Sequence, residues 1–143
     1  MDRVGSMRTG RRGSAAAMLL TVGLLVSGCA LFDPHSQLTL VTLMEDEGYD
    51  IDVTTNPVEI TDDACDGPLD CVEAYSTDEA NYYRFASRDQ ASDYAASLGD
   101  GFVIHYIVMN FAGKDDATKE HQQWAMERLA ATWQDYDGTF PER

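Results

Sequence analysis

Apolar side chains recur at helical spacing in three stretches of the chain, and the clearest stretch begins at Ser87. Ala91, Tyr94 and Leu98 follow at intervals of three and four residues, which places them on one face of a helix. Gln90 lies three residues after Ser87 and completes a capping-box pattern. We therefore predict an amphipathic helix packed on a core.

Two further helices are expected, one before and one after this region. The dipeptide Asp33-Pro34 suits the cap and the first position of a helix over about 34–47. Asp115 or Asp116 can cap a last helix that runs to about Tyr136. The predicted buried face of this last helix is largely apolar and consists of Gln122, Ala125, Met126, Leu129, Trp133 and Tyr136.

Strand patterns occupy much of the remaining chain. Residues 51–60 alternate between apolar and polar with a change of phase at Pro57, which predicts an edge strand. Residues 71–76 and 81–86 predict a β-hairpin around the polar segment 77–80.

The segment 102–111 is almost continuously apolar, so we expect one central strand with both faces covered. Together these elements predict a small α+β domain, with a mainly antiparallel sheet of about four strands and three helices packed on it. The sequence shows no internal repeat and no second domain.

The N-terminal region has a different pattern. Residues 1–28 carry four arginines and one acid, and an apolar run of about twelve residues extends from Ala15 to Val26. A membrane-spanning helix needs roughly 20 apolar residues, so this run is too short for one. A basic start, a short apolar stretch and small residues after it are typical of a secretory signal peptide, whose start can be Met1 or Met7. The paired arginines leave a twin-arginine route open beside the general secretory route.

The end of the apolar run, Val26-Ser27-Gly28-Cys29, resembles the lipobox of bacterial lipoproteins. The resemblance is confined to the N-terminal region. It implies that a peptidase removes a signal peptide over 1–28 and that the thiol of Cys29 carries diacylglycerol. The mature domain would then span 29–143 and be held by lipid at the extracytoplasmic face of the cell membrane. A soluble secreted protein with an incidental cysteine is the alternative.

The N-terminal region and the rest of the chain also differ in charge. The chain has ten basic and 25 acidic residues and a net charge of −15. Without residues 1–28, six basic and 24 acidic residues remain, and the net charge becomes −18. Such a surface repels phosphate backbones, so we expect no nucleic-acid partner. A basic envelope protein, a cationic peptide or a cation would suit it.

Two cysteines remain once Cys29 is assigned to lipid. Cys65 and Cys71 are separated by five residues that include a turn-forming Gly-Pro pair, and outside the cytoplasm such a pair predicts a disulfide. Four acids lie around this loop and raise the possibility of a Ca²⁺ site, although their spacing does not fit an EF-hand. A solvated acidic loop is the simpler interpretation of these four acids, which are Asp62, Asp63, Asp66 and Asp70.

His35, His105 and His121 are the remaining candidates for chemistry. A lone histidine on an apolar strand, such as His105, is more often a satisfied core residue than a catalyst, and the chain carries no known catalytic or zinc motif. We therefore predict no catalytic residues, no metal ligands and no cofactor. Trp124 lies opposite the apolar face of the last predicted helix, on the side of Asp135, and is the predicted partner-binding residue.

The sequence thus predicts a membrane-anchored extracytoplasmic lipoprotein that acts as a small binding or accessory module. Two alternatives stay open. One is an envelope enzyme that uses His105 or His121 with carboxylates, and the other is an immunity-type inhibitor of a cationic envelope enzyme. A carboxylate within hydrogen-bond reach of His105 in a concave pocket would favour the enzyme, and an exposed Trp124 beside ordered acids would favour binding.

Overall fold

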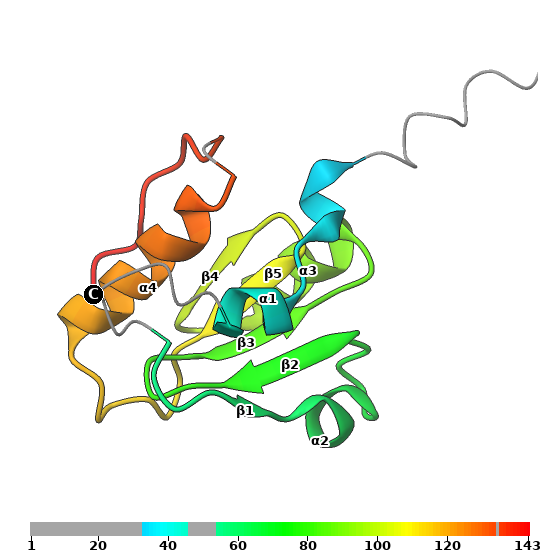
Figure 1. Ribbon diagram of the computed structural model, residues 1–143, viewed down its shortest axis with the longest axis horizontal. Helices are drawn as coiled ribbons and strands as arrows, with labels where there is room; N and C mark the ends of the chain where they lie inside the picture. The colour runs from blue at the N-terminus through cyan, green and yellow to red at the C-terminus, as the bar shows by residue number, and fades with distance from the viewer. Residues whose placement is uncertain (1–32, 46–53, 134) are drawn as a thin grey trace, which may run out of the picture. The chain divides into compact units, whose positions relative to one another are not determined.

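The computed structural model describes residues 33–45, 54–133 and 135–143. The predicted signal peptide, Cys29 and residues 46–53 lie outside the described residues. The described chain forms one antiparallel sheet in the order β1-β2-β3-β5-β4 (Figure 1). Its strands are β1 (Val58–Glu59), β2 (Glu73–Ser76), β3 (Asn81–Arg84), β4 (Gly101–Ile104) and β5 (Ile107–Asn110).

Four α-helices and a short 3₁₀ helix accompany the sheet, so the predicted α+β class is confirmed with one strand and one helix more than expected. The helices are η2 (Pro34–Gln37), α1 (Leu40–Glu45), α2 (Thr61–Cys65), α3 (Arg88–Ser97) and α4 (Lys119–Ala131). Among the described residues no helix has the length and apolar character needed to cross a membrane.

The sheet is covered on both faces, because successive residues of a strand point to opposite sides. On one face α1 and α4 pack over a core that includes Tyr82 and Met109. On the other face α2 and α3 pack over a smaller core that includes Tyr83, Phe85 and Val108. The strand β5 contributes to both cores, as expected of a segment buried on two sides.

The segment 102–111 is not one strand, and this prediction was wrong. It folds into the hairpin β4–β5, in which Ile104 pairs with Ile107 and only His105 and Tyr106 form the turn. His105 has φ +52°, a left-handed conformation that a tight two-residue turn needs and that histidine adopts more readily than most residues. As a result β5 is internal to the sheet and β4 lies at its edge.

The predicted first helix is also divided. Asp33 caps the 3₁₀ helix η2 by accepting a hydrogen bond from the backbone N–H of His35 at 3.0 Å. The chain is then extended at Leu38, so the α-helix starts anew at Leu40. Residues 46 and 47, the end of the predicted helix, lie outside the described residues.

The last helix starts later and ends earlier than predicted. Thr118, and not Asp115 or Asp116, caps α4 by accepting from the backbone N–H of His121. The helix ends at Ala131, so Trp133 and Tyr136 are not part of it. Its buried residues agree with the predicted face and include Gln122, Ala125, Met126 and Leu129.

The predictions for the middle of the chain agree more closely with the structure. The strands β2 and β3 pair as a hairpin. The predicted edge strand over 51–60 is reduced to β1, which does lie at the edge beside β2: residues 54–57 are not a strand, and residues 51–53 lie outside the described part of the chain. Ser87 caps α3 by accepting from the backbone N–H of Gln90 at 3.2 Å.

Candidate functional site

Three segments that are far apart in the sequence meet at the β4–β5 turn. His35 comes from η2, His105 from the turn itself and Asp135 from the segment after α4. The Nε2 atom of His35 lies 2.7 Å from Oδ2 of Asp135, and Nε2 of His105 lies 3.2 Å from its Oδ1. We call these three residues the histidine cluster.

Local backbone structure explains each position. Pro34 and the cap by Asp33 hold His35 in the first turn of η2. The tight turn places His105 at the end of the β4–β5 hairpin. Asp135 reaches both histidines because α4 has ended four residues earlier, so the predicted position of Asp135 on a helix beside Trp124 was wrong.

The two imidazole rings lie against one another and against an indole. Their centroids are 3.8 Å apart and their planes are tilted by 32°. The ring of Trp133 lies 4.8 Å from the ring of His105 and 5.9 Å from that of His35. Both histidine side chains are largely buried, with exposed fractions of 18% for His35 and 14% for His105, whereas Asp135 is 45% exposed. The cluster is therefore sheltered on the histidine side and open to solvent on the carboxylate side.

A second carboxylate, that of Asp33, contacts the other ring nitrogen of His35. Asp33 Oδ1 lies 2.7 Å from Nδ1 of His35, and its Oδ2 accepts from Arg88 at 2.7 Å and from the Tyr106 hydroxyl at 2.9 Å. Partial removal from water on its own would raise the pKa of Asp33, but the hydrogen bonds from His35, Tyr106 and Arg88 outweigh it. They hold the pKa of Asp33 well below its usual range, so this group stays ionised.

The pKa values of His105 and Asp135, two members of the cluster, are also lowered. Burial lowers the pKa of His105, and the nearby His35 and Arg88 add to this effect, against the opposing influence of Asp135. For Asp135, partial removal from water would raise the pKa, but the hydrogen bonds from His105 and His35 lower it below its ordinary value. The cluster thus favours a neutral imidazole at His105 beside an ionised carboxylate.

The described part of the chain brings one group of three or more metal-ligating side chains together, and this group is the histidine cluster. One ligand atom from each of its residues lies within 4.8 Å of the others. Asp62, Asp63, Asp66 and Asp70 are exposed and are not brought together in this way.

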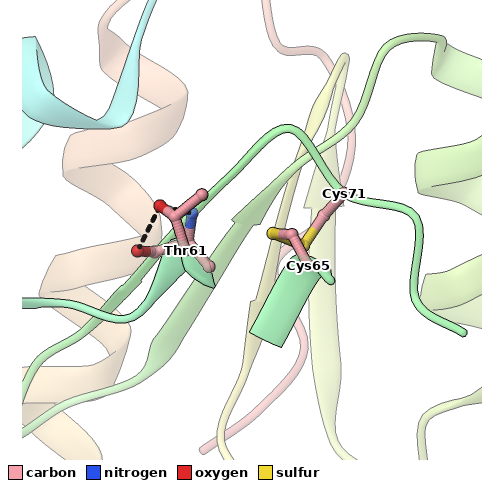
Figure 2. Close-up of a disulfide and its surroundings, with 4 residues drawn as sticks. Thr61, Cys65 and Cys71 are labelled. Atoms are coloured by element: carbon pink, nitrogen blue, oxygen red, sulfur yellow. Dashed lines mark hydrogen bonds between the residues drawn. A yellow bond between two sulfur atoms is a disulfide. The ribbon is translucent and has the colours of Figure 1, made fainter. Parts of the chain in front are cut away.

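The predicted cysteine pair lies at the smaller core, on the side of the sheet covered by α2 and α3. Figure 2 shows the two cysteines with Thr61. The sulfur atoms of Cys65 and Cys71 are at bonding distance, with the Cα atoms 4.8 Å apart. Thr61, at the start of the same helix, accepts from the backbone N–H of Ala74 at 3.1 Å and donates to its carbonyl at 3.3 Å. The disulfide loop is in this way fixed to β2 and closes over the smaller core.

Trp124 and His121 lie elsewhere, on α4. The indole of Trp124 is partly buried, packs against the larger core and contacts the His121 ring, with centroids 5.4 Å apart. His121 is exposed and borders an open hollow with Glu79, Lys114 and Thr118. Within the described residues no hydrogen bond or ion pair joins its side chain to a carboxylate.

No local pattern in the sequence joins His35, His105 and Asp135, and none points to Arg88 or Tyr106 as their neighbours. One signal was available for the turn, because the pair His105-Tyr106 is the main polar interruption of an otherwise apolar segment. No protein-family model, curated protein or solved structure matches the chain.

Proposed function

We propose that the chain is an extracytoplasmic lipoprotein, held to the cell membrane by lipid on Cys29, whose domain acts as a binding or accessory module for a cationic partner. The lipobox-like sequence that ends at Cys29 supports the anchor. The distribution of charge over the domain supports the class of partner.

The observation that carries this proposal is that the basic side chains of the domain are engaged in hydrogen bonds within it. All six basic residues of segment 29–143 lie in the described part of the chain, and each makes a hydrogen bond within it. Arg84, Lys114 and Arg128 donate to backbone carbonyls of distant segments. All six cations are therefore engaged in contacts within the fold, which include the ion pairs of Arg88 with Asp33 and of Arg143 with Asp100.

Many carboxylates, by contrast, face water. Asp62 and Asp63 on α2 and Asp66 at its end are exposed, and their carboxylates accept no hydrogen bond and form no ion pair among the described residues. An excess of unpaired negative charge attracts cationic molecules over a distance of about one Debye length, roughly 8 Å at physiological salt. A basic protein or peptide fits this surface best, and an immunity-type inhibitor of a cationic enzyme would use the same attraction.

The contact between His105 and Asp135 favours the alternative, an envelope enzyme. His105 lies within hydrogen-bond reach of Asp135, at 3.2 Å. However, the hollow bordered by His121 does not include His105 among its lining residues. The acidic binding module therefore remains our first proposal.

A lysine-rich peptide tests the surface directly. We expect the mature protein in detergent to bind this probe at low ionic strength and to lose at least about tenfold in affinity at high salt, because surface attraction is screened. Replacing Asp62, Asp63 and Asp66 together by asparagine should weaken binding at low salt, as measured by fluorescence anisotropy of a labelled peptide.

Replacement of the same three residues by glutamate is the matched control, because it keeps the charge and changes only side-chain length. The glutamate variant should bind the peptide as the wild type does. Binding that does not respond to salt, or equal weakening in the asparagine and glutamate variants, would contradict recognition by charge.

A further inference from the structure

The imidazole of His35 lies between two carboxylates. Its Nδ1 lies 2.7 Å from a carboxylate oxygen of Asp33, and its Nε2 lies 2.7 Å from one of Asp135. A neutral imidazole has a single N–H, so it can donate to only one of them, and its other lone pair then faces a carboxylate. Nη2 of Arg88 also lies 2.9 Å from Nδ1, but a bond from it would leave the same lone pair directed at Asp33. A metal ion bound to Nε2 resolves the conflict, because Nδ1–H can then donate to Asp33.

The second histidine adds a further ligand atom beside the same carboxylate. Nε2 of His105 is directed at the other oxygen of the same carboxylate, 3.2 Å away, and the two imidazole rings are in contact. The three ligand atoms lie within 4.8 Å of one another, so one divalent ion placed between them would neutralise the carboxylate and bind the Nε2 lone pairs of both rings. We propose that the histidine cluster is a Zn²⁺-binding site, with Nε2 of His35, Nε2 of His105 and the carboxylate of Asp135 as ligands.

The ligand types and their spacing fit this ion. Imidazole nitrogens with a carboxylate suit zinc and similar first-row metals, whereas Ca²⁺ and Mg²⁺ prefer oxygen ligands alone. Ligand atoms at the usual zinc distances, near 2.1 Å from the ion, lie about 3.4 Å from one another in a tetrahedron. The ligand atoms of the cluster lie within 4.8 Å of one another, so small side-chain movements suffice.

The groups around the cluster are those that metal sites use. A metal-binding histidine usually donates its second ring N–H to a carboxylate, and Asp33 lies in this position behind His35. Asp33 is itself held by Arg88 and Tyr106, which fixes the ring in the orientation that directs Nε2 at Asp135. Three protein ligands leave a fourth position for water or for a group from another molecule, and the exposed side of Asp135 gives access to it.

Zinc titration of the mature protein in detergent, after removal of metal by a chelator, tests the proposal. We expect binding of one equivalent, and a Co²⁺-substituted form with the visible absorption of a four-coordinate site. Replacement of a ligand in His35→Ala, His105→Gly or Asp135→Asn should weaken Zn²⁺ binding by more than about 100-fold, and Asp33→Asn by about 10- to 100-fold. Glycine is chosen at position 105 because it tolerates the left-handed backbone of the turn.

His121→Ala is the matched control, because it removes the third histidine of the mature segment without touching the cluster. It should leave the zinc affinity unchanged, and circular dichroism should show that each variant is folded. Weak binding by the wild type, or stoichiometric binding that survives all the cluster variants, would overturn the proposal. The outcome is independent of the peptide experiment, because the three acids changed there lie outside the cluster.

Discussion

Replacing Cys29 by alanine should abolish incorporation of a clickable fatty acid into the protein. The proposed anchor is a lipid on this single thiol, and each buried methylene contributes about 0.8 kcal/mol to membrane binding. Two acyl chains therefore hold the protein at the membrane far more durably than contacts of the polar domain with the membrane would. The incorporated label, and not the membrane fraction, is the correct measurement, because an uncleaved apolar run can still associate with the membrane.

The other two cysteines of the chain provide the control for this experiment. The double variant Cys65→Ala/Cys71→Ala removes the other two cysteines and should retain the full label. Labelling of Cys29→Ala at the wild-type level, or loss of label in the double variant alone, would show that the lipid is carried elsewhere.

The variant Phe85→Ala should lower the free energy of unfolding by about 3 to 5 kcal/mol. The side chain of Phe85 is only 2% exposed and belongs to the smaller core beneath α3. Its ring lies 5.4 Å from that of Tyr94, which α3 contributes. Truncation removes these contacts and leaves a cavity in the core that joins α2 and α3 to the sheet. Because domains of this size are stable by about 5 to 15 kcal/mol, the loss is a large fraction of the total.

Chemical denaturation, followed by circular dichroism, measures this effect. Phe85→Leu keeps most of the apolar volume and should cost clearly less than the alanine variant. A destabilisation below about 1 kcal/mol for Phe85→Ala would contradict the packing of α3 on this face.

The sequence was informative where local signals and tertiary packing agree. The helix capped by Ser87 and the hairpin β2–β3 follow from spacing, capping and turn residues that lie close together in the chain. The β4–β5 hairpin was missed because both of its strands are apolar and its turn holds His105 and Tyr106, without the usual glycine or asparagine. A continuous apolar run then has the appearance of a single strand.

The candidate site depends on contacts that no local pattern contains. His35 and Asp135 are 100 positions apart in the sequence, and His105 lies 30 positions before Asp135. They meet only because the hairpin turns back at His105 and because α4 ends at Ala131. Both features were predicted incorrectly, so the two histidines and Asp135 remained three separate residues with no shared chemistry.

Affinity capture of the lipidated protein from its own membrane tests the proposed binding function most directly. Cross-linked partners are compared at low and high salt for the wild type, for the variant with asparagine at residues 62, 63 and 66, and for the variant with glutamate there. We predict a basic partner that the wild type and the glutamate variant retain at low salt, that the asparagine variant retains less well, and that high salt releases. A partner that is acidic, that resists high salt, or that the asparagine variant captures as fully as the wild type would contradict the proposal.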